Sequence, residues 1–332
     1  MESIIRVLND LREEIYDRQL KSSLIDDAVQ EKIEKLRVLV PGCGALGSAI
    51  SEMLVRMGVG KLRIIDFDFV EPSNYPRTKS IGLLDSLSRV PKVVACESFL
   101  RRINPFVDIE SIYGWISPLN SESLVDGIDV VMDGLDNLKT RSFIARAAWR
   151  RGVPYVYSGV SDYYYNVVPI IPQKTTCFDC LFTVPKREKG GVPVLVSTVY
   201  SAAAIAVMVL LRIIKGIVES GIIVGDIFNF SVDKIPISID RCDCDKEPSS
   251  PRTCTLEEMG DNYVLFTSGL DLYDLMDYLK QDCIVIDRDK WVLSLFCESN
   301  IISIYRDGTI VCKNGDCYKR LNVIAGRLGC KL

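Results

Sequence analysis

The sequence predicts an α/β protein with a Rossmann-like, mostly parallel sheet, helices on both of its faces, and a small C-terminal α+β module. Short apolar strands alternate with helical patterns through residues 37–158, which is typical of a parallel sheet. A polar segment at residues 245–252, rich in proline and serine, then indicates a domain boundary. We therefore expect two domains, residues 1–245 and residues 246–332.

The composition limits the chemistry that this chain can perform. Its 332 residues are 48% hydrophobic and 25% charged, so it can bury a sizeable core. It contains no histidine, which excludes Ser-His-Asp and Cys-His nucleophiles and imidazole metal ligands. A formal net charge of −4 and a pI near 5.2 argue against nucleic-acid binding, which needs a basic surface.

A strand, a glycine-rich turn, a helix and a second strand follow one another near residue 40. The apolar run Val38–Val40 leads into a G-x-G-x-x-G at Gly42–Gly47, and apolar residues then recur with helical spacing up to Met57. A second strand, Leu62–Ile65, ends on Asp66. This order is typical of a nucleotide-binding βαβ unit, in which backbone N–H groups approach a phosphate and the acid accepts hydrogen bonds from a ribose. The alternative is a turn that merely packs a helix on a sheet.

A second acidic position follows another predicted strand. Residues Ile128–Met132 lead into the segment DGLDN, after which we expect a helix to about Arg150. Because the carboxyl ends of parallel strands meet at one edge, Asp136 and Asp66 should lie on the rim that carries the glycine loop. The alternative role for Asp136 is to cap the helix, and one aspartate can do both.

Twelve cysteines accompany an N-terminal segment that is charged throughout residues 1–35 and shows no secretory signal. This combination favours a cytoplasmic protein whose cysteines are thiols or metal ligands rather than a disulfide framework. Two close pairs, Cys177 with Cys180 and Cys242 with Cys244, have the arrangement of a tetrahedral four-cysteine Zn²⁺ site. The alternatives are unrelated thiols, or a redox role for the first pair.

Residues 192–211 carry no charge and are long enough to cross a bilayer. Pro193 and several hydroxyl side chains argue against a membrane span, and a run of small residues near Ala203 suits close helix packing in a core or subunit interface. We expect a packed helix and no membrane partner.

The remaining elements are expected on both sides of the boundary. Before it we expect one or two helices over 2–35, a helix over 91–103, strands over 107–112 and 154–158, a strand or hairpin over 161–171, and closing strands over 227–240. Beyond it we expect strands at 263–266, 284–286, 292–296, 301–305 and 309–312, helices near 270–280 and up to 328, and a hairpin turn at Asp307-Gly308.

Several motifs, taken in order over residues 10–245, give a family resemblance. They are Tyr16-x-Arg18-Gln19, the Gly42 loop, Asp66-Phe67-Asp68, Ser73-Asn74 with Arg77, Lys92, Asp136-Asn137 with Arg141, and the two cysteine pairs. Together they resemble the ubiquitin-activating-enzyme superfamily, whose fold is shared with the bacterial MoeB, ThiF and HesA adenylating enzymes.

The resemblance implies that ATP adenylates the C-terminal glycine of a ubiquitin-like or sulfur-carrier protein, giving an acyl-adenylate and pyrophosphate. The residues that it implies for the nucleotide are Gly42, Gly44, Ala45, Leu46, Gly47, Asp66, Asp68, Asn74, Arg77, Lys92, Asp136 and Asn137. Among them Asn74, Arg77 and Lys92 would contact phosphates, and Asp136 would bind Mg²⁺. Arg18 would reach the triphosphate of the other subunit of a homodimer. The implied catalytic set is Asp136, Arg77, Lys92 and Arg18.

The chain departs from this family at two positions. Thr78 follows Arg77, where the family usually has glutamine. Residues 184–190 contain no cysteine, although many members carry one there that takes the carrier protein as a thioester. Either the enzyme stops at the acyl-adenylate or another thiol substitutes. The best substitute is Cys254, which precedes a possible helix capping box at Thr255–Glu258; the alternative is a linker cysteine without a role.

The family core does not contain residues 255–332. This module could recruit a conjugating enzyme, or it could only stabilise the dimer. Rival functions for the whole chain are adenylation of a peptide or small carboxylate, a non-catalytic scaffold in an activating complex, and a dinucleotide oxidoreductase. The phosphate-handling residues argue against a scaffold, and Asp136 and the cysteine pairs have no task in hydride transfer.

Overall fold

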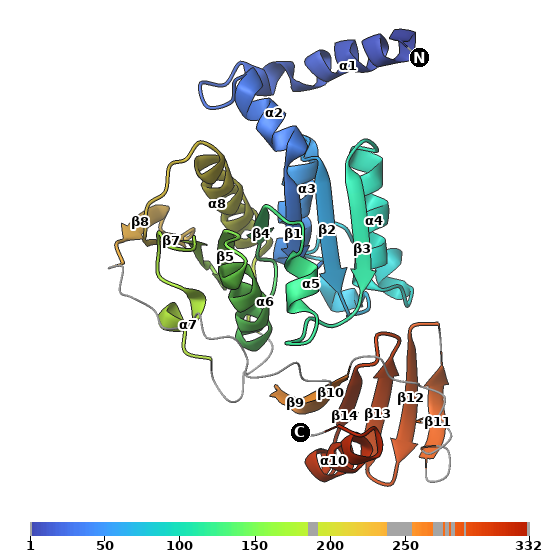
Figure 1. Ribbon diagram of the computed structural model, residues 1–332. Coiled ribbons are helices and arrows are strands. Elements are labelled where there is room, and N and C mark those ends of the chain that lie inside the picture. The colour runs from blue at the N-terminus through green and yellow to red at the C-terminus, as the bar shows by residue number, and fades with distance from the viewer. Residues whose placement is uncertain are drawn as a thin grey trace.

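The structure is a computed structural model that describes residues 2–184, 192–237, 254–267, 275, 279, 283–288 and 290–330. The predicted domain boundary at residue 245 and the predicted helix near 270–280 fall largely outside these ranges. Two sheets organise the chain, one on each side of that boundary (Figure 1).

The larger sheet has eight strands in the order β3-β2-β1-β4-β5-β6-β7-β8. Strands β1 to β5 pair in parallel, and β6, β7 and β8 continue the sheet with antiparallel pairings. Their bounds are β1 Arg37–Pro41, β2 Lys61–Asp66, β3 Asp108–Tyr113, β4 Val130–Met132, β5 Tyr155–Ser161, β6 Tyr164–Ile170, β7 Ile222–Asp226 and β8 Ser231–Ile235. The prediction of a mostly parallel α/β sheet is confirmed.

Helices cover both faces of this sheet, as predicted. On one face lie α3 (Ala45–Met57), α4 (Lys92–Ile103) and α8 (Val196–Ile214); on the other lie α5 (Ser121–Val125), α6 (Leu138–Arg150) and α7 (Phe178–Leu181). Two short 3₁₀ turns, η1 (Pro72–Asn74) and η2 (Asp85–Leu87), lie between β2 and α4. Each face has its own hydrophobic core, which is why the parallel strands are continuous apolar runs rather than alternating ones.

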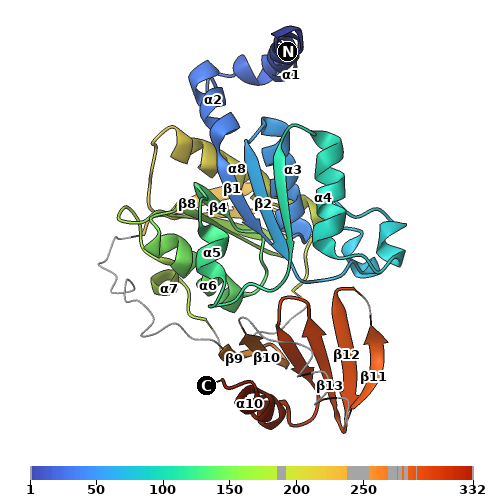
Figure 2. The same ribbon diagram turned by 45° about the vertical axis from the view of Figure 1, so that its right-hand side comes forward.

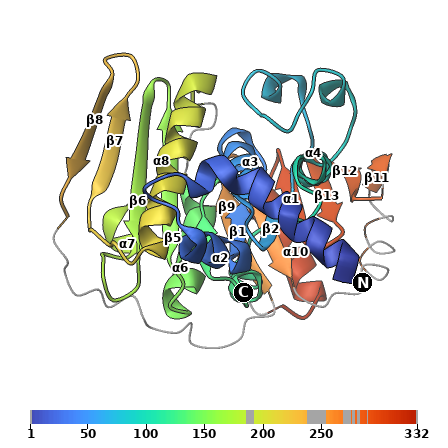
Figure 3. The ribbon, with the colours of Figure 1, turned by 90° about the horizontal axis from the view of Figure 1, so that it is seen from above.

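Two N-terminal helices lie at the amino end of the parallel strands. Helix α1 is Glu2–Leu20, of which the backbone alone is described up to residue 10, and α2 is Asp27–Lys35. Figure 3, which looks onto this end, shows α1 crossing over that edge of the sheet.

Helix α8 is the one helix in the described ranges that is long and apolar enough to cross a membrane. One side of it packs against α3, β5 and β6, where Val199, Ala202 and Ala206 are fully buried. The predicted role of the small residues in close helix packing is therefore confirmed.

The C-terminal module is a six-stranded antiparallel sheet with α10 packed on β10 and β14. Its strand order is β11-β12-β13-β14-β10-β9. The bounds are β9 Cys254–Met259, β10 Asn262–Thr267, β11 Cys283–Arg288, β12 Val292–Cys297, β13 Asn300–Tyr305, β14 Ile310–Lys313 and α10 Cys317–Arg327. Five of these strands and the last helix lie where the sequence predicts them; β9 was not predicted.

Three disulfides cross-link the module: Cys254–Cys330, Cys283–Cys297 and Cys312–Cys317. The prediction that the cysteines act as thiols or metal ligands rather than as disulfides is therefore wrong for this module. A unit of about 75 residues has a small core, so cross-links that restrict its unfolded chain supply stability that burial does not.

The module lies against the carboxyl ends of the parallel strands (Figures 1 and 2). A hydrophobic cluster joins the two sheets: Trp115 and Phe67 come from the large domain, and Met259, Val264, Phe266, Val311 and Tyr305 come from the module. The same edge of the large sheet carries the glycine loop.

Candidate functional site

The glycine loop connects the carboxyl end of β1 to the start of α3. Gly42 has a φ of +88°, which favours glycine, and its N–H donates to the carbonyl of Ile65 at 2.8 Å. Gly44 is the residue before α3, and a Cβ built there meets no atom within 4 Å. The predicted loop residues Ala45 and Leu46 then open the helix. The residue before α3 therefore borders open space, and the start of a helix is where backbone N–H groups can bind an anion.

Two further glycines let two segments of backbone touch beneath this loop. A Cβ on Gly47 would lie 1.9 Å from the carbonyl oxygen of Gly42. A Cβ on Gly134, in the loop after β4, would lie 2.4 Å from the Cα of Gly47. The loops that follow β1 and β4 are thus held against each other at the point where the strand order reverses, which is where α/β sheets bind ligands.

Asp66 lies at the end of β2, beside this loop. Its carboxylate accepts the N–H of Cys43 and the N–H of Asp68, both at 2.7 Å. Burial, and then the charge of Asp68, raise the pKa of Asp66 to about 6. The side chain is therefore an oriented hydrogen-bond acceptor at the position predicted for a ribose.

Asp68 and Lys92 form an ion pair at the same edge. The ammonium of Lys92 lies 2.8 Å from a carboxylate oxygen of Asp68, and the Lys92 N–H donates to the Asp68 carbonyl at 2.8 Å. Burial lowers the pKa of Lys92, but the charges of Asp68, Asp66 and Asp136 outweigh it and leave that pKa raised. Lys92 is thus a fixed cation close to the glycine loop.

Asp136 is exposed and makes no hydrogen bond or ion pair with the residues that the structure describes. The cap of α6 is its neighbour Asn137, whose side-chain oxygen accepts the N–H of Thr140 at 2.9 Å. The alternative role predicted for Asp136, helix capping, is therefore performed by Asn137. This leaves the Asp136 carboxylate available to a ligand, close enough to Lys92 to influence its pKa.

A buried ion pair holds the loop that presents Asp136. Asp133 is fully buried at the end of β4, and its carboxylate lies 2.9 Å from Nε of Arg141 on α6. The guanidinium of Arg141 also donates to the carbonyls of Leu135 and Ser158. Burial raises the pKa of Asp133 although Arg141 opposes that change. The loop from Asp133 to Asp136 is therefore tied to α6 and β5.

Asn74 and Arg77 lie in the segment after β2. Asn74 is buried, and its side-chain oxygen accepts the N–H of Glu71 at 2.9 Å, which closes the η1 turn. Arg77 is half-buried and donates to the carbonyl of Ser73 at 2.5 Å. Their contact with phosphate stays a prediction.

Arg18 lies at the opposite edge of the sheet from the residues described above. It is 94% exposed near the end of α1, with Asp17 3.9 Å away. Tyr16 and Gln19 instead face the end of α3, where Gln19 donates to the carbonyl of Met57 at 3.2 Å. Within one chain, Arg18 therefore does not join the other predicted site residues.

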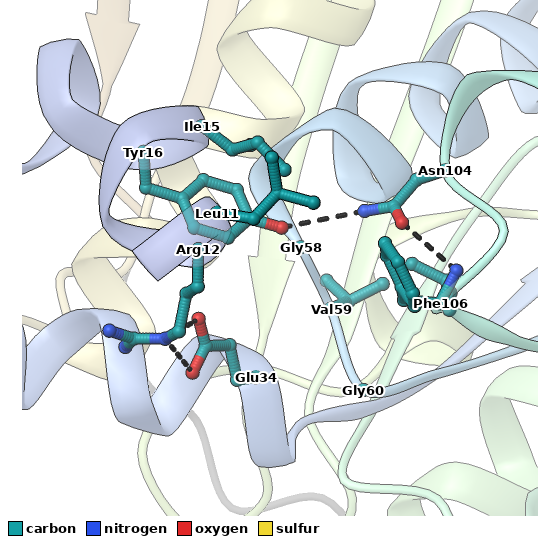
Figure 4. Close-up of a pocket in the computed structure, with 11 residues that line it drawn as sticks. Leu11, Arg12, Ile15, Tyr16, Glu34, Gly58, Val59, Gly60, Asn104 and Phe106 are labelled. Atoms are coloured by element: carbon teal, nitrogen blue, oxygen red, sulfur yellow. Dashed lines mark hydrogen bonds and ion pairs between the residues drawn. The ribbon is translucent and has the colours of Figure 1, made fainter. Parts of the chain in front are cut away.

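A pocket of about 250 Å³ lies at that opposite edge, between α1 and the segment before β3 (Figure 4). Leu11, Ile15 and Phe106 line it, and its polar groups are already paired: Tyr16 with Asn104, and Arg12 with Glu34. It is far from the glycine loop, because it borders the residues immediately before β2 and β3.

The first cysteine pair lies at α7: Cys177 is the residue before this helix and Cys180 belongs to it. Helix α7 is attached to α6 through Asp179. The carboxylate of Asp179 accepts hydrogen bonds from Ser142 at 2.7 Å and from Arg146 at 2.6 Å. Cys177 is buried and Cys180 is exposed. Cys242 and Cys244 lie outside the described residues, and within these no cluster of three or more Cys, Asp or Glu could hold a metal. The zinc site stays a prediction.

Cys254, the candidate substitute nucleophile, is the first residue of β9 and is bonded to Cys330. Residues 255–258 belong to the same strand rather than to a helix start. Both parts of that prediction are wrong, because pairing along β10 outweighs the local capping pattern.

A comparison with models of protein families identifies the family of this chain. The model described as the ThiF family matches residues 16–251. The chain belongs to the ThiF family. The match ends before the C-terminal module, as the predicted resemblance does.

Two relatives show how far the likeness extends. The Bacillus subtilis sulfur carrier protein ThiS adenylyltransferase is 35% identical to this ThiF-family chain over 166 residues, which are 50% of this chain and 49% of that protein. The SAMP-activating enzyme E1 of Haloferax volcanii is 30% identical over 178 residues, 54% of this chain and 64% of that protein. The chain thus spans less than two thirds of the length of either relative.

Solved structures confirm the fold of this ThiF-family chain. Escherichia coli MccB with MccA-N7isoASN has a TM-score of 0.62 at 19% identity, over 70% of this chain and 75% of that one. PaaA has a TM-score of 0.58 at 19% identity, over 68% of this chain and 83% of that one. At this identity the likeness concerns the fold alone.

Two residues with clear roles in the site were not singled out from the sequence. Asp133 stands before Asp136, the acid predicted to bind a ligand. The sequence does not tell a buried aspartate from an exposed loop aspartate, because the partner Arg141 is found only in the fold. Gly134 was part of the DGLDN segment, where a glycine signals a turn but not the backbone that it will meet.

Replacement of Gly134 by alanine tests the contact between the two loops. The added Cβ would meet the Gly47 backbone, so we expect Gly134→Ala to lower the free energy of unfolding by about 2–3 kcal/mol or more. Chemical denaturation measures this. The matched control Gly44→Ala has open space and should lose about 1 kcal/mol at most. Equal stability of both variants would contradict the contact.

Proposed function

We propose that this chain uses ATP to adenylate the C-terminal glycine carboxylate of a ubiquitin-like or sulfur-carrier protein. The observation that carries the proposal is the exposed Asp136, which no residue in the described part of the chain engages, while Asn137 caps the helix. Asp136 lies close enough to Lys92 to raise the pKa of that lysine. The relatives named adenylyltransferase and activating enzyme support the same reaction class.

The reaction joins two anions, and the site supplies the charges that this requires. A carboxylate oxygen of the carrier forms a bond to the α-phosphorus of ATP, and the bond to pyrophosphate breaks. The N-terminal amides of α3 would bind the phosphates, and Lys92 and Arg77 would neutralise their charge. Asp66 would orient the ribose, so that the α-phosphate meets the incoming carboxylate.

Asp136 fits a Mg²⁺ ligand because it is an exposed carboxylate beside the space for phosphates. Mg²⁺ held by Asp136 would supply positive charge against the negative charge of the triphosphate. The ion pair with Asp68 would keep the Lys92 ammonium in place before the nucleotide arrives.

Arg18 would act across a homodimer. Tyr16 and Gln19 attach this part of α1 to α3, so the exposed Arg18 is held outward at a fixed position on the surface. We propose that it reaches the triphosphate in a second copy of the chain.

The proposed reaction ends at the acyl-adenylate. Residues 184–190 contain no cysteine, and Cys254 is occupied by its disulfide. The activated carrier would then pass to an acceptor outside this chain. A conjugating enzyme that docks on the outer surface of the C-terminal module is one such acceptor.

Exchange between ATP and labelled pyrophosphate tests the reaction and the role of Asp136. With ubiquitin-like carriers that end in Gly-Gly, we expect carrier-dependent exchange, which Asp136→Ala lowers by about 100-fold or more. The matched control is Asp108→Ala, which removes an exposed acid at the amino end of β3, away from the edge that carries Asp136. It should leave the exchange rate unchanged.

Two outcomes of this assay would count against the proposal. If Asp136→Ala exchanges as the wild type does, Asp136 is not in the site. If short peptides support exchange as well as folded carriers do, the substrate is a peptide carboxylate rather than a carrier protein.

The raised pKa of Asp66 predicts a pH dependence of ATP binding. A ribose hydroxyl donates best to the ionised carboxylate, so binding should strengthen as the pH rises through about 6. If binding lowers this pKa by about one unit, affinity falls roughly fivefold between pH 7 and pH 5. Calorimetry at several pH values measures it. Asp66→Asn should keep only the dependence that ATP itself contributes; an identical profile for both proteins would show that Asp66 does not titrate.

We propose further that Cys177, Cys180, Cys242 and Cys244 bind one structural Zn²⁺. Tetrahedral thiolate coordination would join α7 to the segment that leads to the C-terminal module. The purified full chain should then contain about one zinc per chain by elemental analysis. Cys180→Ser should lose it, and the control Cys96→Ser, on α4, should keep it. A wild-type chain free of zinc would refute this site.

A further inference from the structure

One turn of the C-terminal module makes hydrogen bonds to the large domain at the edge that carries the glycine loop. In the hairpin between β13 and β14, one carboxylate oxygen of Asp307 accepts the N–H of Thr309 at 2.9 Å. The other oxygen accepts the N–H of Trp115, in the segment after β3, at 2.8 Å. The carboxylate is therefore oriented by its own turn and bridges the two domains.

The approach of Asp307 depends on a glycine in the large domain. A Cβ on Gly114 would lie 2.9 Å from the Asp307 oxygen that accepts the Trp115 N–H. On its other side, the carbonyl of Trp115 accepts a hydrogen bond from Asn120 at 2.7 Å. The backbone of Trp115 is thus held on both sides: its N–H by the module and its carbonyl by the large domain.

Trp115 connects the turn that carries Asp307 to β2, the strand that ends on Asp66. Its ring stacks on Phe67, with centroids 3.5 Å apart and planes 18° apart. Phe67 stands between Asp66 and Asp68 in the sequence. Tyr305 of the module packs edge-on against Trp115 at 5.6 Å and against Phe67 at 6.4 Å. The backbone that carries the predicted ribose acceptor is therefore packed against the module.

The strand order shows which part of a nucleotide this contact would affect. The glycine loop, which would bind the phosphates, follows β1, and Asp66, the predicted ribose acceptor, ends β2. The next strand in the sheet is β3. A nucleotide laid along this order would place its base at the ends of β2 and β3. Phe67 and Trp115 follow these two strands directly or within two residues.

We propose that the C-terminal module completes the base end of the nucleotide site, with Asp307 as a positioning residue that acts through Trp115 and Phe67. The ligand at this end is the base of a nucleoside triphosphate, so the inference rests on the proposed function. Two further contacts fix the module in place: Lys139, three residues after Asp136, lies 2.7 Å from Glu257, and Arg89 pairs with Asp287.

The experiment measures the binding of ATP and of inorganic triphosphate to the full chain by calorimetry. Asp307→Ala removes the bridge, and Gly114→Ala displaces Asp307 from the other side. We expect each variant to bind ATP at least about tenfold more weakly and to bind triphosphate as the wild type does, because the phosphate loop is untouched. The Michaelis constant for ATP should rise with little change in the exchange rate at saturating ATP.

Asp316→Ala is the matched control, since it removes an aspartate of the same module whose carboxylate pairs with Lys319 at the surface, 2.7 Å away. It should change neither affinity. If the Asp307 and Gly114 variants bind ATP normally, or lose ATP and triphosphate affinity equally, the inference is wrong. A wild-type chain that binds ATP no more tightly than triphosphate also overturns it. Loss of carrier-dependent exchange alone contradicts the proposed function and leaves the binding result to decide this inference.

Discussion

The site depends on the backbone contact between the loops after β1 and β4. Gly42, Gly47 and Gly134 lie so close that a Cβ on any of them would overlap backbone atoms of another. This contact sets the distance between the start of α3, which offers amides, and the loop that carries Asp136, which offers a carboxylate. The pairing of β1 with β4 brings the two loops to the same place, and the glycine contact lets their backbones touch there.

Charge is distributed around that contact so that one acid stays available. Asp133 is neutralised by Arg141 inside the domain, and Asp68 is neutralised by Lys92 at its edge. Asp66 is held by two backbone N–H groups, and Asn137 takes the helix cap. The one acid of this group that no described residue engages is Asp136, which suits a residue that must meet a metal ion and phosphates.

The two ends of the parallel strands serve different purposes. At the carboxyl end, the disulfide-linked module and the nucleotide edge share a hydrophobic cluster and the Asp307 bridge. At the amino end, α1 crosses the sheet (Figure 3) and carries Arg18, whose side chain is 94% exposed. The two domains thus meet at the end of the strands that carries the glycine loop, and Arg18 lies at the other end.

The sequence by itself determined the elements and motifs that depend on near neighbours. The β1–loop–α3–β2 unit with Asp66, and five of the six module strands, follow from local spacing and turn chemistry. Only the tertiary structure decided that Asn137 rather than Asp136 caps α6, that Cys254 bonds Cys330 across 76 residues, and that Asp307 reaches Trp115 across 192. These outcomes depend on contacts between residues far apart in the sequence, and a local sequence pattern does not specify such contacts.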